Sequence, residues 1–325
     1  MNFPEPVSEW LKDKEQEYDS QHSYKTRKSD VKQFIEWLDD TGRDWEPVEQ
    51  ERHKRLLHRY FLSLNGNKDE KGYARKTVSS RWASIKLMYS EFAGFYAYLD
   101  ETPFENLKKK STYLPDANQN EASSSKPYIT KQQKIELVDN VPSPKFRNEV
   151  IIETMFQTGL RQSSIANLKI EDVNLKENKL EEFYCPKVND TFTNSFSDSL
   201  NWLLDEWING GYRAGYTGAN ESDYLFLTHR SEKIRDERPN IIIKKAAENA
   251  GIQEVMYQDK AGRNRYKITS HAIRRGHAMY LWKEPHDVDL RTIQGRLNHS
   301  SLQMTMEYLP ISPDDEADKL EGIQF

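Results

Sequence analysis

The sequence predicts a mainly α-helical protein with a small β-sheet, divided into two domains. Three observations indicate this architecture. Apolar residues recur three and four positions apart over most of the chain, which is the period of a helix. The period is lost from Lys108 to Lys126, a polar stretch rich in Ser, Asn and Lys that is typical of an exposed linker. It is lost again over residues 179–197, where Phe, Tyr and Thr surround a polar turn and favour a β-hairpin.

Residues 1–107 form the first predicted domain, a compact helical bundle. The apolar pattern predicts helices over residues 7–20, over 23–39, after Pro47, and over 76–99. We interpret the aromatic residues of the last helix as core rather than as a surface for stacking bases. Basic residues in and just before that helix are predicted on its opposite face as candidate contacts to DNA phosphates, namely Arg75, Lys76, Arg81 and Lys86.

Residues 127–325 form the second predicted domain, which is mostly helical and ends in a tail at 309–325. Thr130 fits the N-cap of a helix that runs to Val138. Residues 223–227 predict a short strand or a buried extended segment. Two or three helices are expected within 270–309, with breaks near Pro285 and Asn298. Other helices are predicted over residues 145–158, 162–168, 198–209 and 239–250.

Composition and charge limit the setting and the partners. No run of about 18 apolar residues occurs, which excludes a membrane-spanning helix on length. The single cysteine, Cys185, allows neither an internal disulfide nor a cysteine-based zinc site, and no signal peptide is visible, so we expect a cytoplasmic protein. The net charge of −5 argues against indiscriminate binding to nucleic acid. Basic residues are nevertheless concentrated in 71–86 and 260–283, which contain no acid.

Residues 270–309 contain side chains suited to chemistry at a phosphate. His271 and Arg274 are three positions apart and therefore share one face of a helix. His299 follows 25 residues after Arg274, and Tyr308 nine residues after His299. An imidazole can move a proton, a guanidinium can bind an anion through paired N–H groups, and a phenol can act as a nucleophile. Two further candidates lie earlier in the chain, Arg161 and Lys187.

These candidates resemble the conserved boxes of the tyrosine recombinase, or phage integrase, family. TGLRQSSIANLKIEDV (158–173) resembles the first box of the family, and HAIRR (271–275) resembles its His-x-x-Arg box. DLRTIQGRLNHSSLQMTMEYLPIS (289–312) resembles its closing segment. KTVSSRWASIKLMYSEF (76–92) resembles part of its core-binding domain, so the resemblance covers nearly the whole chain.

The resemblance implies a site-specific DNA recombinase that cuts and rejoins double-stranded DNA through a 3′-phosphotyrosine intermediate, without metal, ATP or another cofactor. Tyr308 would be the nucleophile, His271 the proton acceptor and Lys187 the proton donor. The full set of implied catalytic residues is Arg161, Lys187, His271, Arg274, His299 and Tyr308, and Arg275 is a further candidate DNA contact.

The resemblance also implies an assembly. The active form would be a homotetramer on two DNA sites, and accessory DNA-bending proteins are compatible with it. The reaction would be integration or excision of a mobile element. Because the chain begins almost directly with the core-binding helices, a simple integrase or an enzyme of the Xer kind is favoured over one with an additional arm-binding domain.

Two functional alternatives share this pattern. A type IB topoisomerase uses the same chemistry to relax DNA, and a catalytically impaired member of the fold would bind DNA without cutting it. The acid that the family commonly carries three positions after its first arginine is Ser164 here. The glycine that usually precedes the last histidine is Asn298, which tolerates a left-handed backbone better than most residues.

Other assignments also have rivals. Lys176 and Lys179 compete with Lys187 for the place of the catalytic lysine. His271, His277 and His299 could instead bind zinc, although no carboxylate or thiol lies at a suitable spacing. The tail after Tyr308 either docks on a neighbouring protomer or is an unstructured acidic end; its apolar stripe is Ala317, Leu320 and Ile323.

Overall fold

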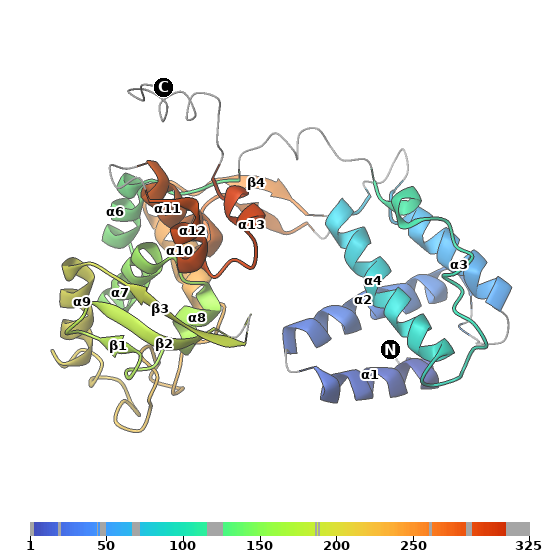
Figure 1. The fold of residues 1–325 in the computed structure, drawn as a ribbon, viewed down its shortest axis with the longest axis horizontal. Helices are drawn as coiled ribbons and strands as arrows, with labels where there is room; N and C mark the ends of the chain where they lie inside the picture. The colour runs from blue at the N-terminus through green and yellow to red at the C-terminus, as the bar shows by residue number, and fades with distance from the viewer. Residues whose placement is uncertain are drawn as a thin grey trace. The chain divides into compact units, whose positions relative to one another are not determined.

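The chain divides into two compact units, Met1–Ser124 and Ser125–Phe325, and each has a hydrophobic core of its own. Figure 1 shows these units in a computed structural model. None of the described helices is long and apolar enough to cross a membrane. The structure describes residues 3–18, 21–43, 45, 50–66, 72–115, 126–185, 187, 189–259, 262–283 and 288–309.

The N-terminal unit is built from helices that bury their apolar stripes against one another (Figure 1). Phe34, Tyr60 and Tyr89 are almost completely buried, and the rings of Phe34 and Tyr60 meet edge to face with centroids 4.9 Å apart. The aromatic residues of the last long helix up to Phe92 are therefore core, as predicted. The helices are α1 (Glu5–Glu17), α2 (Gln21–Asp40), α3 (Gln50–Ser63) and α4 (Arg75–Ala93).

The N-terminal unit extends into the segment that was predicted as linker. Residues Lys110–Tyr113 form a short 3-10 helix, η1, and Tyr113 is fully buried. Its ring packs 5.3 Å from that of Trp82, and its hydroxyl lies 2.8 Å from Nδ1 of His58. The prediction that the linker starts at Lys108 is therefore wrong, because one aromatic side chain in a polar stretch is enough to fix it to the core. Residues 116–125 of that predicted linker lie outside the described residues.

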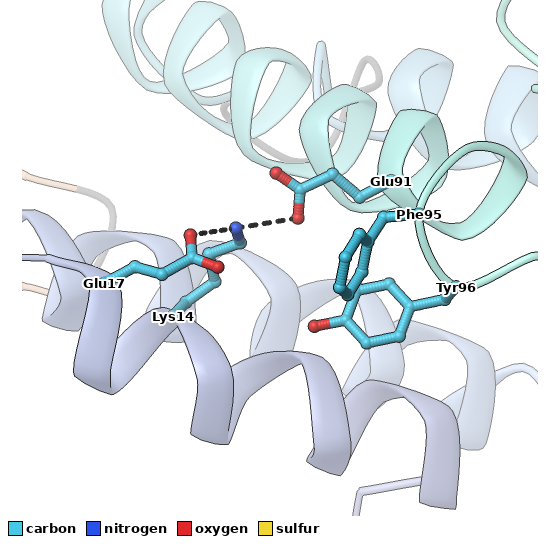
Figure 2. Close-up of a pocket in the computed structure, with 5 residues that line it drawn as sticks. All are labelled: Lys14, Glu17, Glu91, Phe95 and Tyr96. Atoms are coloured by element: carbon cyan, nitrogen blue, oxygen red, sulfur yellow. Dashed lines mark hydrogen bonds and ion pairs between the residues drawn. The ribbon is translucent and has the colours of Figure 1, made fainter.

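Helix α4 ends at Ala93, six residues before the predicted end. The apolar period continues past this point, but Phe95 is 84% exposed. It borders a small pocket between α1 and α4, where Lys14 forms ion pairs with Glu17 and Glu91 (Figure 2). The period alone could not distinguish this exposed ring from the buried ones before it.

The C-terminal unit is mostly helical. Helix α6 begins at the predicted N-cap: Thr130 accepts a bond from the Gln133 backbone at 3.2 Å, and the Gln133 side chain accepts one from the Thr130 backbone at 3.0 Å. Helix α7 is the central helix, since it buries residues on nearly all sides. The helices are α6 (Lys131–Asp139), α7 (Lys145–Thr158), α8 (Gln162–Asn167), α9 (Asp198–Ile208), α10 (Arg238–Asn249), α11 (Ser270–Lys283), α12 (Leu290–Leu297) and α13 (Leu302–Met306).

A three-stranded antiparallel sheet packs on these helices (Figure 1). It consists of β1 (Val173–Asn174), β2 (Lys179–Cys185) and β3 (Asp190–Ser195). Strands β2 and β3 form the predicted hairpin, and its register pairs Leu180 with Asn194 and Cys185 with Asp190. The mainly helical fold with a small sheet is thus confirmed.

Two extended segments complete this unit. The segment 223–227, predicted as a strand or buried extended chain, pairs with Lys169 through an isolated bridge at Tyr224 and buries its last three residues. Leu225 donates its backbone N–H to the Leu168 carbonyl at 2.7 Å. A second hairpin, β4 (Val255–Gln258) with β5 (Asn264–Tyr266), was not predicted. All four residues of β4 are exposed, so the strand lacks the apolar alternation by which strands are found in a sequence.

Two phenylalanines close together in the chain test this description of the N-terminal core. Phe92→Ala should lower the free energy of unfolding of this unit by about 3–5 kcal/mol, because it removes a fully buried ring. Phe95→Ala should change it by less than about 0.5 kcal/mol, because that ring is in solvent. The measurement is urea unfolding of the full chain, followed by pulse proteolysis with fragments assigned to residues 3–115. Equal losses for the two variants would contradict the position of the α4 end.

Candidate active site

The turn after α7 places Arg161. Gly159 adopts a left-handed conformation with φ of 68°, and a Cβ atom there would lie 2.5 Å from the His277 ring. Only glycine therefore fits both the backbone and the space. The turn makes Arg161 the N-cap residue of α8, and its guanidinium donates to the Asn298 carbonyl at 3.4 Å.

Arg274 lies next to Arg161, on the buried side of α11. It is 2% exposed, and its guanidinium donates to the Gly159 carbonyl at 2.6 Å and to the Leu297 carbonyl. Loss of hydration, followed by the charge of Arg161, lowers the pKa of Arg274 to about 10. Among the described residues neither arginine has a carboxylate partner. Two adjacent cations with unused charge favour an anionic ligand.

The end of α12 places His299. Asn298 is left-handed there, with φ of 49° and ψ of 53°, as the sequence predicts. His299 is 5% exposed, and its Nδ1 lies 3.0 Å from the Thr305 hydroxyl. Its Nε2 is buried and has no partner in the described part of the chain. Loss of hydration, then the charges of Arg274 and Arg161, lower the pKa of His299 to about 3.

Tyr308 lies among these groups. Its ring meets His299 edge to face with centroids 4.7 Å apart, and the Arg275 guanidinium lies 5.5 Å from the ring centre. Its hydroxyl interacts with Arg274 and partly offsets the loss of hydration that lowers the pKa of that arginine. Leu309, the next residue, is buried in a small core with Ile293 and Leu297 and anchors the end of the segment.

The remaining two candidates border the same group. His271 reaches solvent, yet protein surrounds it closely enough that loss of hydration is the largest cause lowering its pKa to about 4. The charges of Arg275, Arg274, Lys187 and Arg161 lower it further, in that order. Lys187 is exposed and lies close enough to lower the pKa of both His271 and His299.

The structure thus brings together all six predicted residues: Arg161, Lys187, His271, Arg274, His299 and Tyr308. The rival lysines lie elsewhere. Lys179 begins β2, at the end of the hairpin opposite the turn, and pairs with Glu177 at 2.5 Å. Lys176 is exposed before that strand.

Ser164 and Cys185 were not predicted to be partners. Ser164 is 1% exposed, and its hydroxyl lies 3.5 Å from the Cys185 sulfur, which lies 4.0 Å from the Arg161 guanidinium. A serine and a thiol therefore occupy the space beside Arg161 where the family pattern has an acid. The burial of both Phe183 and Cys185 on β2 follows the alternation of a strand, which is the signal that could have placed this sulfur inward.

His277 has a structural position. Its Nδ1 lies 2.7 Å from the Phe156 carbonyl, and burial lowers its pKa to about 3. Within the described ranges, no three His, Cys, Asp or Glu side chains are grouped so that they could hold a metal ion. The alternative zinc site of His271, His277 and His299 has no support in this geometry.

The predicted DNA contacts on α4 differ in their exposure to solvent. Arg75, Lys76 and Lys86 on α4 are exposed, although Arg75 also donates to the Pro115 carbonyl at 2.7 Å. Arg81 is only 7% exposed: its guanidinium stacks 4.0 Å from the Tyr73 ring centre and donates to the Gln33 side chain. The prediction that Arg81 lies on the exposed face is wrong, because the long side chain bends inward over the core.

Arg275, the other predicted DNA contact, is half-buried. It donates to the Pro127 carbonyl at 3.0 Å and lies over the Tyr308 ring. The structure therefore places it beside the candidate nucleophile.

Comparison with known proteins shows the family of the chain. Residues 127–314 match the phage integrase family. The chain belongs to the phage integrase family. Tyrosine recombinase XerC of Herpetosiphon aurantiacus is 26% identical to this integrase over 297 residues, which cover 88% of the chain and 84% of the relative. Tyrosine recombinase XerA of Pyrococcus furiosus is 27% identical over 187 residues, 57% of each chain.

Solved structures share the fold of this integrase. The Tn1549 transposon integrase in complex with circular intermediate DNA superimposes with a TM-score of 0.65 at 16% identity, over 98% of this chain and 99% of that one. The XerH recombinase in its post-cleavage complex with a palindromic difH substrate superimposes with a TM-score of 0.63 at 15% identity. The match covers 92% of this chain and 79% of the XerH chain. The fold is therefore the one that the sequence predicts. The family and the recombinase relatives identify the chain as an enzyme of the tyrosine recombinase class.

The histidine pKa values predict a specific titration. In the DNA-free protein, His271, His277 and His299 should remain neutral from pH 8 to about pH 5, because their pKa values lie below the ordinary value of about 6.5. Unfolding lets these rings take up protons, so the free energy of unfolding should fall as the pH falls from about 6.5 toward 3. NMR of isotopically labelled histidines checks this prediction. A His299 ring that titrates near pH 6.5 would contradict its position in the site.

Proposed function

We propose that this integrase cuts a DNA strand with Tyr308 and joins it to a new partner strand in site-specific recombination. The observation that carries the proposal is the position of Tyr308 against His299, Arg274 and Arg275. The acceptors of these two arginines among the described residues are backbone carbonyls. The names of the relatives, which are recombinases and integrases, favour recombination over the relaxation of DNA by a topoisomerase.

Phosphate binding falls to the two arginines and His299. Arg161 and Arg274 can donate N–H groups to the non-bridging oxygens of a phosphodiester, and they stabilise the additional negative charge of the transition state. His299 is neutral at physiological pH because its pKa is about 3. In the tautomer in which Nδ1 accepts from the Thr305 hydroxyl, the buried Nε2 carries the proton and can donate to the phosphate.

Proton transfer falls to His271 and Lys187. As Tyr308 Oη forms a bond to phosphorus, its proton passes to His271, which is unprotonated at neutral pH because its pKa is about 4. The bond from phosphorus to the 5′ oxygen breaks, and that oxygen takes a proton from the Lys187 ammonium group. The products are a 3′-phosphotyrosine and a free 5′ hydroxyl. Rejoining runs the same transfers in reverse with a different 5′ hydroxyl, so no nucleotide is consumed.

The two units divide the work on DNA in this proposal. The N-terminal unit, Met1–Ser124, is the core-binding domain, with Arg75, Lys76 and Lys86 on α4 contacting phosphates, and the C-terminal unit, Ser125–Phe325, is the catalytic domain. Solved neighbours support DNA as the partner, among them a λ integrase dimer bound to a core site. A homotetramer on two DNA sites, help from DNA-bending proteins, a cytoplasmic setting and action on a mobile element follow from the family. The predicted docking of the tail after Tyr308 falls on residues outside the described part of the chain.

Substitution of the nucleophile tests the function. Tyr308→Phe should form no covalent adduct on a nicked suicide substrate and no strand-exchange product between two differently labelled duplexes, because the attacking oxygen is gone. Tyr280→Phe should retain both activities, since the ring of Tyr280, on α11, packs beside that of Phe156, on α7. Denaturing gels detect both products. Equal adduct from wild type and Tyr308→Phe would mean that another residue is the nucleophile, and no adduct from wild type would indicate an impaired, DNA-binding member of the family.

A pair of lysines on one hairpin tests the general acid. Lys187→Ala should slow adduct formation by about 10²–10⁴-fold, the usual contribution of a positioned proton donor. Lys179→Ala should cleave at the wild-type rate, because its ammonium pairs with Glu177 away from the turn. Single-turnover cleavage at saturating protein is the measurement. If Lys179→Ala cleaved slowly and Lys187→Ala cleaved at the wild-type rate, Lys179 rather than Lys187 would be the general acid.

A further inference from the structure

The base of the β2–β3 hairpin is fixed by one buried amide. Asn194 is 4% exposed, and its side-chain nitrogen donates to the Thr158 carbonyl at 3.1 Å and to the Arg296 carbonyl at 3.0 Å. Thr158 is the last residue of α7, and Arg296 lies in the last turn of α12. A single side chain on β3 therefore joins the ends of two helices.

The Arg296 side chain reinforces the same junction. Its Nη2 donates to the Gln157 carbonyl at 3.0 Å and to the Ser195 carbonyl at 2.9 Å, and its Nε lies 3.4 Å from His277 Nε2. Because His277 Nδ1 is bonded to the Phe156 carbonyl, Nδ1 carries the proton and Nε2 accepts from Arg296. In the described part of the chain, Arg296 donates to uncharged acceptors. Its guanidinium therefore forms several hydrogen bonds there and no salt bridge.

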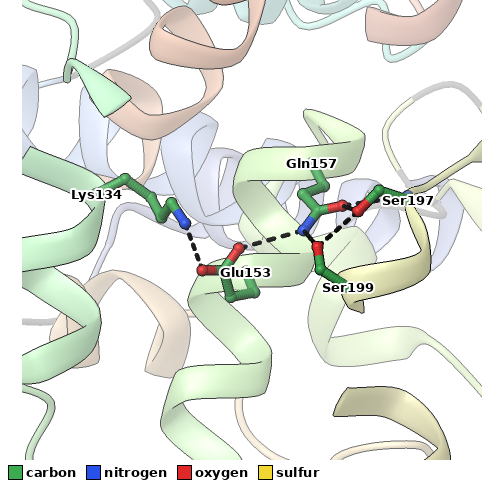
Figure 3. A network of polar contacts seen from close by, with 5 residues as sticks. All are labelled: Lys134, Glu153, Gln157, Ser197 and Ser199. Atoms are coloured by element: carbon green, nitrogen blue, oxygen red, sulfur yellow. Dashed lines mark hydrogen bonds and ion pairs between the residues drawn. The ribbon is translucent and has the colours of Figure 1, made fainter. Parts of the chain in front are cut away.

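Gln157 extends the junction past the end of β3. Figure 3 shows its side chain between Glu153 and two serines, with its oxygen accepting from the Ser197 hydroxyl at 2.7 Å and from the Ser197 backbone at 3.2 Å. The Glu153 carboxylate in turn pairs with Lys134 at 2.5 Å. The chain that leaves the hairpin is thus fixed to α7 on both sides of Phe196.

The three segments that meet at this junction each carry a residue of the active site. Arg161 follows three residues after Thr158, His299 follows three residues after Arg296, and Lys187 lies in the turn of the hairpin whose base is Asn194. We propose that Asn194 is a positioning residue for Lys187, with Arg296 as its support. This inference rests on the proposed role of Lys187 as the proton donor.

Physical reasons support this role. Strand β1 pairs with β2 only at Lys179 and Leu180, and Lys187 is exposed in the turn beyond, so the position of the donor depends on how the base of the hairpin is held. A displacement of about 1 Å in a reacting group can slow a reaction by about 100-fold. The only competing interpretation is that Asn194 stabilises the fold without affecting the proton transfer.

The chemistry of the leaving group separates these two interpretations. A substrate with sulfur in place of the 5′ bridging oxygen releases a thiolate, which needs no proton from Lys187. A variant that is slow only because Lys187 is misplaced should therefore recover on the sulfur substrate. A variant that is slow because the site is distorted should remain slow on both substrates.

The experiment compares Asn194→Ala, Lys187→Ala and the double variant in the full chain, on oxygen and sulfur substrates, by single-turnover adduct formation. Asn201→Ala is the matched control, because its amide also donates to a backbone carbonyl, that of Leu175 at 2.5 Å, away from the turn. DNA affinity and Tm are measured for each variant. If Asn194→Ala does not fold, Asn194→Ser, which keeps one hydroxyl donor, replaces it.

We expect Asn194→Ala to slow cleavage of the oxygen substrate by about 100-fold, with DNA affinity within about twofold of wild type. The sulfur substrate should restore the rate, the double variant should be no slower than Lys187→Ala, and Asn201→Ala should cleave normally. The inference would be overturned if Asn194→Ala were equally slow on both substrates, or if it were not slow at all. It would also be overturned if the rate losses of Asn194→Ala and Lys187→Ala multiplied in the double variant. If Lys187→Ala itself is not restored by sulfur, the proposed acid is wrong instead.

Discussion

The C-terminal unit depends on two arginines that have no carboxylate partner among the described residues, the buried Arg274 and the half-buried Arg296. The last carbonyl groups of a helix have no partners within the helix, and the end carries partial negative charge. Arg274 and Arg296 bond to such carbonyls at the ends of α7 and α12, namely those of Gly159, Leu297 and Gln157. Each guanidinium is thereby held in place while its full charge remains. A carboxylate partner would hold it equally well but would neutralise the charge that a phosphate requires.

This arrangement has an energetic consequence for the empty site. Cations brought together and removed from water raise the free energy of the folded protein, and the lowered pKa values of Arg274, His271 and His299 reflect that cost. A bound phosphodiester relieves it by supplying the missing negative charge. The binding energy of DNA is therefore directed to the scissile phosphate, and the histidines become easier to protonate when the phosphate is present. Ser164 and Cys185 lie beside Arg161 in the candidate active site, and no acid of the described residues competes there with a bound phosphate.

The residues of the candidate active site could be predicted from the sequence, whereas the residues that hold its segments together could not. Arg161, His271, Arg274, His299 and Tyr308 lie in short boxes whose internal spacing is set by one turn or one helix, so local pattern is enough to find them. Asn194 and Arg296 meet across 102 positions of the chain, and no local pattern indicates such a contact. The same limit explains the burial of Arg81 and Tyr113, which contact Gln33 and His58 across 48 and 55 positions of the chain. The hairpin β4–β5 escaped prediction for a different reason, since its strand is exposed on both faces.

Tyr308 and the phosphate-binding arginines are held by different kinds of support, because Tyr308 follows the short helix α13. Arg161 and Arg274 bond to backbone carbonyls at the ends of α12 and α7, whereas Tyr308 follows a helix of five residues that buries only Thr305. So short a helix has little stability of its own and opens at low cost. The position of the attacking oxygen therefore rests on two local contacts, the buried Thr305 before Tyr308 and the buried Leu309 after it. A change at these contacts can move the attacking oxygen while the arginines keep their places.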